Sequence, residues 1–172
     1  MIMKKIFYIV SCALICLALA SCEKIGPEMT ATVDMAGQWY VQVDGAYNDG
    51  SEDWEDPFDM GRFIILTSNT AANIPTEMIV NDLGSFWDFS VKVQCNPDAK
   101  TFSVNDGDNL SYESKVTITD GKIVENGTTT PSGMPADYIE FYVVFDDDDY
   151  VPDYYDKLKF SGWRYTGFVN DD

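Results

Sequence analysis

The chain has 172 residues, of which 29 are acidic and 11 basic, so its formal charge is −18, and it contains no histidine. This charge argues against binding to nucleic acid and against electrostatic docking on anionic lipid. The lack of histidine removes the commonest general base and the usual zinc ligand. We therefore predict no catalytic residue, no metal ligand and no cofactor.

The first residues have the pattern of an export signal. Lys4 and Lys5 precede an apolar stretch, residues 6–20, that is too short for a permanent membrane span. Leu19-Ala20-Ser21-Cys22 then has the spacing that lipoprotein signal peptidase requires. We predict a lipoprotein signal peptide over residues 1–21 and lipidation of Cys22. A plain secretory signal with an incidental cysteine is the alternative.

Lipidation would place the protein in the cell envelope, anchored through Cys22 to a membrane, with the outer membrane as the first choice. Two or three acyl chains hold a protein at a bilayer almost irreversibly, because each buried methylene contributes about 0.8 kcal/mol. Removing Lys4 and Lys5 gives the mature chain a charge of −20. Only Cys22 and Cys95 remain after cleavage, so no disulfide forms within the chain, and Cys95 is expected to be a buried thiol or a loop residue.

The mature chain is expected to have a tether, residues 22–35, followed by one domain, residues 36–172. In that domain short runs rich in aromatic and β-branched residues alternate with turn-forming clusters, which is typical of consecutive antiparallel strands. Nine runs are candidate strands: 38–43, 62–68, 77–81, 87–94, 101–105, 111–119, 122–125, 138–146 and 157–168. Their number and spacing favour a closed barrel or a sandwich.

Alternation along these runs predicts an apolar inner face and a polar outer face. The inner set is Trp39, Val41, Val43, Trp87, Phe89, Val91, Val93, Val116, Ile118, Ile139, Phe141, Val143, Phe145, Leu158 and Phe160. The outer set is Asp88, Ser90, Lys92, Lys115, Thr117, Glu140, Lys157 and Lys159. Asp120-Gly121 favours a tight turn, so we predict a hairpin over residues 111–125.

The two ends of the domain favour the barrel. Gly37-Gln38-Trp39-Tyr40 resembles the glycine-any-tryptophan opening of lipocalins and other calycins. Gly162-Trp163-Arg164 resembles the last strand of that superfamily, where an arginine packs over the opening tryptophan. The resemblance implies an eight-stranded calycin-like barrel closed at one end by Trp39 and Arg164. An exposed Arg164 is the alternative.

A closer resemblance covers most of the mature chain. It is carried by residues 67–73, 78–82, 121–123 and 137–145, and most specifically by residues 161–168, Ser-Gly-Trp-Arg-Tyr-Thr-Gly-Phe. These segments resemble the bacterial lipoproteins grouped as lipid-binding putative hydrolases. The resemblance implies a calycin-like barrel on a lipid anchor and a lipid-binding role. The resemblance assigns no catalytic residues to this chain. Many members of the family have tyrosine where this chain has Trp163.

The predicted ligand pocket is the open end of the barrel, since barrels of this type hold small apolar ligands there. Its candidate lining residues are Trp39, Trp87, Phe89, Phe141 and Phe160, which can equally form a filled core. The acidic segment 44–60 can form a mobile lid across the mouth or a weak calcium site, and the acidic run 146–149 is expected to be a solvated loop, with a cation site as the alternative. Aromatic loop residues such as Trp54 and Tyr154 can also stack on sugars.

Three functions remain open. The favoured one is a membrane-anchored protein that binds a small apolar or amphiphilic, lipid-like ligand in the barrel. The second is a non-enzymatic accessory lipoprotein that assembles with envelope proteins in a nutrient uptake complex, for example for glycans. The third is a carboxylate-dependent hydrolase, which the family label motivates and the missing histidine disfavours.

Overall fold

A computed structural model describes residues 29–149 and 151–171 of the chain. The proposed signal peptide and Cys22 lie outside these residues. Within these described residues, nine strands and two short helices follow one another. They are β1 (Gly37–Ala46), β2 (Glu52–Glu55), β3 (Phe63–Asn69), β4 (Glu77–Asn81), β5 (Ser90–Asn96), β6 (Thr101–Asp108), β7 (Lys115–Thr129), β8 (Pro135–Phe145), α2 (Val151–Tyr154), β9 (Lys157–Arg164) and the 3-10 helix η1 (Val169–Asp171).

The strands form one closed antiparallel barrel, as predicted. Neighbours in the sheet follow the order β2-β1-β3-β4-β5-β6-β7-β8-β9, and β1 also pairs with β9. That closing ladder runs from Trp39 opposite Arg164 to Ala46 opposite Lys157. Eight strands therefore make the barrel, and β2 is a short addition that pairs with the end of β1. The sequence Glu-Asp-Trp-Glu of β2 has no apolar alternation, which is why it was not predicted.

The prediction of a hairpin with its turn at Asp120-Gly121 is wrong. Residues 115–129 form one long strand, β7, which pairs with β8 on both sides of this dipeptide. Its register shifts between Thr119 and Lys122, and Asp120 has a φ of 54°. The dipeptide therefore forms a β-bulge, which bends a strand without reversing it. A turn and a bulge both use a residue of positive φ followed by glycine, so this local sequence does not separate them.

Most of the other strand boundaries also differ from the prediction; β6, for example, ends at Asp108 and not at Asn105, and β8 begins at Pro135 and not at Tyr138. Three further differences lie near the two ends of the barrel. The strand expected from Trp87 begins at Ser90, and the one expected from Ser111 begins at Lys115. The last strand ends at Arg164 and not at Phe168. In the first case the backbone N–H groups of residues 86–89 donate to the Asp82 carboxylate, so they are not available to a neighbouring strand.

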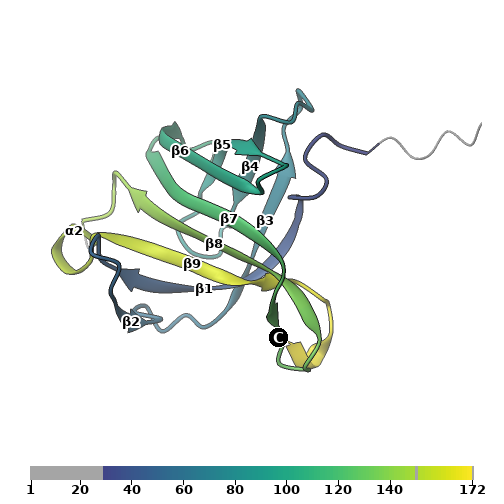
Figure 1. Cartoon of the computed structure of the whole chain (residues 1–172). Helices are drawn as coiled ribbons and strands as arrows, with labels where there is room; N and C mark the ends of the chain where they lie inside the picture. The colour runs from purple at the N-terminus through teal and green to yellow at the C-terminus, as the bar shows by residue number, and fades with distance from the viewer. Residues whose placement is uncertain (1–28, 150, 172) are drawn as a thin grey trace, which may run out of the picture.

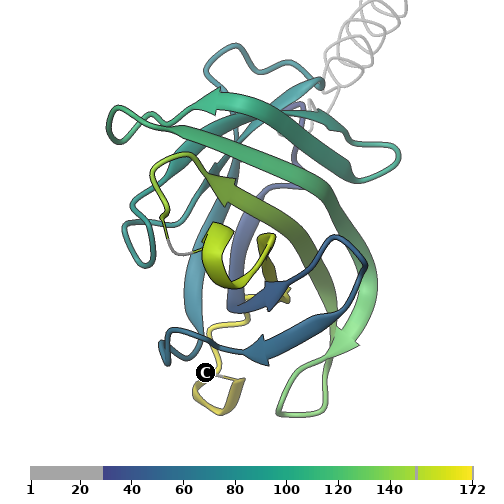
Figure 2. The same cartoon turned by 90° about the vertical axis from the view of Figure 1, so that its left-hand side faces the viewer.

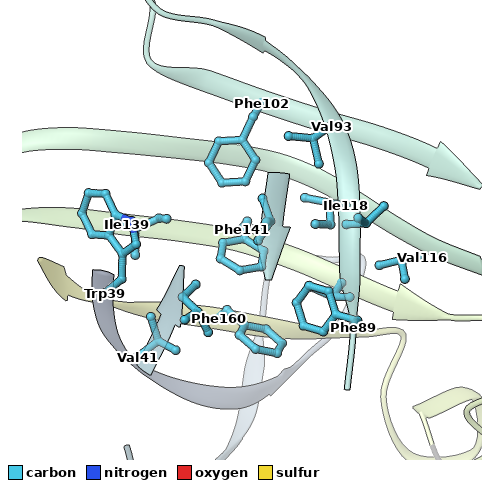
Figure 3. Close-up of a cluster of buried hydrophobic side chains, with 14 of the residues drawn as sticks. Trp39, Val41, Phe89, Val93, Phe102, Val116, Ile118, Ile139, Phe141 and Phe160 are labelled. Atoms are coloured by element: carbon cyan, nitrogen blue, oxygen red, sulfur yellow. The ribbon is translucent and has the colours of Figure 1, made fainter. Parts of the chain in front are cut away.

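The predicted inner face is the core of the barrel (Figure 3). All of its members are buried except Trp87, which is half-buried at one end. Most of the predicted outer set is exposed or half-buried. Ser90 is the exception, and the reason is local: its N–H donates to Asn109 Oδ1 and its carbonyl accepts from Leu110 N–H, so the β6–β7 loop covers it.

The barrel has two unlike ends (Figure 1). Four connections lie at one end, which we call the mouth: residues 47–62, 82–89, 109–114 and 146–156. Figure 2 looks onto this end and shows α2 in front of the ring of strands. At the opposite, closed end lie the start of β1, the long β7–β8 hairpin and the C-terminal segment (Figure 1).

The chain segments that flank the barrel are packed against its closed end. Residues 31–35 form a turn, and Met35, in the stretch expected to be a tether, is fully buried in the core. Near the C-terminus, Asp171 accepts hydrogen bonds from Ser132 and Thr166, which lower the pKa of its carboxyl to about 2. Within the described residues no helix is long and apolar enough to cross a membrane.

Candidate functional site

The closed end is sealed by Trp39 and Arg164. The guanidinium carbon of Arg164 lies 4.3 Å from the centroid of the Trp39 ring. Arg164 also donates to the Ala36 carbonyl and to Asp137, at 2.7 and 3.0 Å, and the Trp39 indole N–H donates to Thr67 at 2.8 Å. A β-carbon at Gly37 would lie 2.2 Å from Arg164, so glycine leaves the room for this arginine. A ligand therefore has no route through this end.

Aromatic rings fill the interior above Trp39. Phe102, Phe141 and Phe160 are joined ring to ring, with centroids 5.5 and 5.0 Å apart. Phe89 continues the column, 5.9 Å from Phe160 (Figure 3). Of the five residues expected to line a pocket, Trp39, Phe89, Phe141 and Phe160 are thus fully buried and in contact with neighbouring side chains. These four form a packed core, which leaves the mouth as the place to look for a ligand site.

Partly exposed aromatic side chains cover the mouth, and we call them the mouth ring cluster: Phe58, Phe63, Phe86 and Trp87. Phe86 is at its centre. Its ring centroid lies 5.1 Å from that of Phe58, 6.1 Å from that of Phe63 and 5.6 Å from that of Trp87. Phe86 also contacts Phe160, at 5.7 Å, so the cluster continues the interior column to the surface.

The loop that carries Phe86 and Trp87 is folded around a buried carboxylate. Asp82 is fully buried, and its two oxygens accept the backbone N–H groups of five residues at 2.8–3.0 Å. The five donors are Gly84, Phe86, Trp87, Asp88 and Phe89. Such charge-assisted bonds are stronger than neutral ones and fix the course of the backbone. Asp82 therefore positions both rings at the mouth.

A second carboxylate, that of Asp147, joins two aromatic side chains at the rim. The Trp87 indole N–H donates to one oxygen at 3.0 Å, and the Tyr112 hydroxyl donates to the other at 2.6 Å. Partial burial opposes ionisation of Asp147, but these two hydrogen bonds outweigh it, so the pKa of its carboxyl is lowered. Burial and the hydrogen bond to Asp147 raise the pKa of the Tyr112 hydroxyl. Asp147 is therefore charged, and Tyr112 neutral, at physiological pH.

The other half of the mouth is closed by the connection between β8 and β9. Tyr155 is buried, and its ring lies against Gly45, where a β-carbon would be 2.3 Å from it. The Tyr47 hydroxyl donates to the Tyr154 carbonyl, and Asn48 N–H donates to Asp156. This half is thus tied down by hydrogen bonds, whereas the half with Phe86 and Trp87 presents aromatic surface.

An open hollow of about 720 Å³ lies at the rim between β6 and β7. Its lining includes Asp108, Tyr112, Glu113, Lys115 and Asp146. Lys115, the one basic residue among the described residues that line this hollow, is bonded to Asp108 and so is already paired. A second hollow, of about 660 Å³, lies near the opposite end of β6 and is lined by Cys95, Ser103 and Lys122 among others. Burial raises the pKa of the Cys95 thiol, so it is protonated at neutral pH.

The acidic segments do not converge on one point. The Asp146 carboxylate accepts a hydrogen bond from the backbone N–H of Lys115. The Asp147 carboxylate accepts hydrogen bonds from the side chains of Trp87 and Tyr112, and Asp148 is buried. In residues 29–149 and 151–171 no group of three or more acidic or cysteine side chains is arranged to hold a metal ion.

Ionised groups on the outer wall form a separate network. The Glu140 carboxylate pairs with the Lys122 ammonium group at 2.7 Å and accepts a hydrogen bond from the Tyr138 hydroxyl at 2.6 Å. The Lys159 ammonium group lies between the carboxylates of Glu140 and Glu52. Burial and the Glu140 carboxylate raise the pKa of Tyr138 to about 12. The Tyr138 hydroxyl therefore stays protonated at neutral pH, and the network links β7, β8 and β9 through ionised side chains.

The sequence analysis missed the residues that organise the mouth. Asp82, Phe86 and Tyr112 lie in connections, where periodicity gives no information. One signal was present in Asp-Leu-Gly-Ser, because an aspartate followed closely by glycine is typical of a turn in which the carboxylate accepts backbone N–H groups. Trp87 was predicted to point inward from a strand, but it lies in this loop with its indole N–H on Asp147.

The fold and these contacts define a class: a closed eight-stranded antiparallel barrel with a packed aromatic core, one sealed end and an aromatic mouth. Within that class the chain belongs to the family described as lipid-binding putative hydrolase, whose model matches residues 24–169. No curated protein matches the chain at a significant level.

Proposed function

We propose that this protein binds a small apolar or amphiphilic, lipid-like molecule at the mouth of its barrel, while a lipid anchor on Cys22 holds it at a membrane of the cell envelope. The observation that carries the proposal is the mouth ring cluster, which offers partly exposed aromatic surface continuous with the core. An alkyl chain laid on these rings would gain about 25 cal/mol for each Å² of apolar surface removed from water. The family to which the chain belongs supports a lipid as ligand.

The position of the mouth suits an anchored binding protein. The described chain begins at the closed end, where Ala31 N–H donates to Asn73 in the β3–β4 turn. An anchor at Cys22 would therefore join the barrel at the end opposite the mouth. In that arrangement the mouth ring cluster is accessible to ligands from the aqueous side.

The neutral probe 11-bromo-1-undecanol tests the proposal, because bromine quenches the fluorescence of tryptophans that it contacts. We expect the mature chain to show saturable quenching at probe concentrations below aggregation. Trp87→Phe should remove a defined part of that saturable quenching, since Trp87 belongs to the mouth ring cluster. Trp163→Phe is the matched control, because Trp163 is also half-buried but lies on the outer wall beside Tyr40.

Quenching that rises linearly without saturation would contradict the proposal. So would a saturable signal that disappears in Trp163→Phe and survives in Trp87→Phe. The first result would favour the second candidate, a non-enzymatic accessory lipoprotein in an envelope nutrient uptake complex, because a filled barrel can present its outer surface to partner proteins. The outer aromatic group of Tyr40, Trp163 and Tyr165 is the surface that this candidate would use.

A further inference from the structure

The mouth of the barrel has a marked charge that bears on which amphiphile it accepts. We propose that the ligand is an amphiphile with a positively charged head group, which sits in the acidic hollow beside Tyr112 while its alkyl chain lies on the mouth ring cluster. This inference rests on the proposed function and adds the chemical class of the head group.

The distribution of charge along the chain is the first support. The four connections at the mouth contain fifteen of the 29 acidic residues and a single basic residue, Arg62. The guanidinium of Arg62 lies over the Trp163 ring, 4.5 Å from its centroid, and so on the outer wall. A head group at the mouth therefore meets a strongly negative field, which is least screened where the site is partly shielded from water.

The geometry of the hollow is the second support. Asp108, Glu113 and Asp146 line it, and Lys115 is the one basic residue among the described lining residues. Lys115 pairs with Asp108 and also interacts electrostatically with Asp146, so one positive charge faces the three carboxylates that line the hollow. A cationic head group would neutralise part of the negative charge that remains in the hollow, whereas a carboxylate or phosphate would be repelled by it.

The connection between the hollow and the rings is the third support. Tyr112 lines the hollow, and its hydroxyl and the Trp87 indole N–H share the Asp147 carboxylate. Head-group site and chain site are therefore adjacent, joined through one ionised residue. Aromatic side chains beside a carboxylate also suit an alkylammonium ion, because a cation is attracted to the face of an aromatic ring.

A competition experiment on the mature chain tests the inference with three ligands of equal chain length: dodecyltrimethylammonium, dodecanoate and the neutral 1-monododecanoylglycerol. Each displaces 11-bromo-1-undecanol, and the readout is the concentration for half displacement. At low ionic strength we expect the ammonium compound to displace the probe at a concentration about tenfold or more below that of dodecanoate, with the neutral compound between them. The difference should shrink in 0.5 M salt, because the Debye length falls.

Matched variants locate the effect. Asp88→Asn with Asp149→Asn removes two exposed charges at the mouth, and Asp98→Asn with Asp120→Asn removes two exposed charges away from it. Each pair includes one residue of positive φ, Asp88 at 51° and Asp120 at 54°, which asparagine tolerates. We expect the mouth pair to reduce the preference for ammonium over carboxylate by about threefold or more, and the control pair to change it by less than about 1.5-fold.

The outcomes separate this inference from the proposed function. If all three compounds displace the probe equally, or dodecanoate displaces it best, the mouth still binds amphiphiles and only the head-group inference is overturned. If both variant pairs reduce the preference equally, the charge effect belongs to the whole protein and the head-group site is overturned as well. If neither the probe nor any of the three compounds binds saturably, the proposed function and this inference both fail.

Discussion

The Asp82 carboxylate accepts five backbone N–H groups of its own connection while it is fully buried. The conformations it holds are unfavourable in isolation: Leu83 and Asp88 have φ values of 57° and 51°. A positive φ in a residue other than glycine is costly unless the surroundings impose it. One side chain therefore sets the place of Phe86 and Trp87.

We expect Asp82→Asn to lower the free energy of unfolding by about 3 kcal/mol, because hydrogen bonds to a charged acceptor are lost and the new amide N–H₂ faces N–H donors. The exposed Asp88→Asn on the same connection is the control, with an expected change below about 0.5 kcal/mol. Urea denaturation measures both. Equal, small losses in the two variants would mean that the carboxylate of Asp82 does not hold the loop. Asp82→Asn should also weaken probe binding, since it releases the two rings.

For single residues, the sequence predicted the position of side chains inside strands well and the position of side chains in connections poorly. Alternation placed Phe89, Phe141 and Phe160 on the inner face, where they are buried. It also placed Trp87 there, but Trp87 lies in a connection whose course depends on Asp82. The same limit applies to Phe58 and Tyr112, because contacts between separate connections have no trace in local periodicity.

Strand β7 shows how an element can be misinterpreted when its residues are correctly assigned to strands. The inward positions of Val116, Ile118 and Ile123 were compatible with two strands joined by a turn or with one bulged strand. The structure has one strand, since Lys122 pairs with Glu140 and Thr119 with Tyr142 on the same partner. The bulge lets β7 bend around the barrel without breaking the ladder.

Gly121 is expected to be needed for space at this bulge. A β-carbon there would lie 2.5 Å from the backbone oxygen of Phe102 and 2.5 Å from its ring. We expect Gly121→Ala to destabilise the protein by about 2 kcal/mol, and Thr119→Ala, at an exposed position of the same strand, to have an effect below about 0.5 kcal/mol. Thermal and urea unfolding measure both variants. An unchanged stability in Gly121→Ala would contradict the close approach of β6 and β7.

At the scale of the whole molecule, the barrel is polarised between a sealed end and an aromatic, acidic mouth. The closure was predicted from the resemblance of the Trp39 and Arg164 segments to calycins, and in the structure these two residues are opposite each other where β1 pairs with β9. The sequence was not enough for the interior, since the volume left by packed rings depends on their mutual geometry. The ring-to-ring contacts of Phe102, Phe141 and Phe160 leave the mouth as the place for a ligand.

The indole N–H signals of the tryptophans give the most direct test of ligand binding at the mouth. In a two-dimensional ¹⁵N–¹H NMR titration of the mature chain with 11-bromo-1-undecanol, the Trp87 signal should shift saturably, because its N–H lies on Asp147 at the rim. The Trp39 signal should stay in place, because its N–H donates to Thr67 at the closed end. A shift of the Trp39 signal with Trp87 unchanged, or no saturable shift of either, would contradict the account.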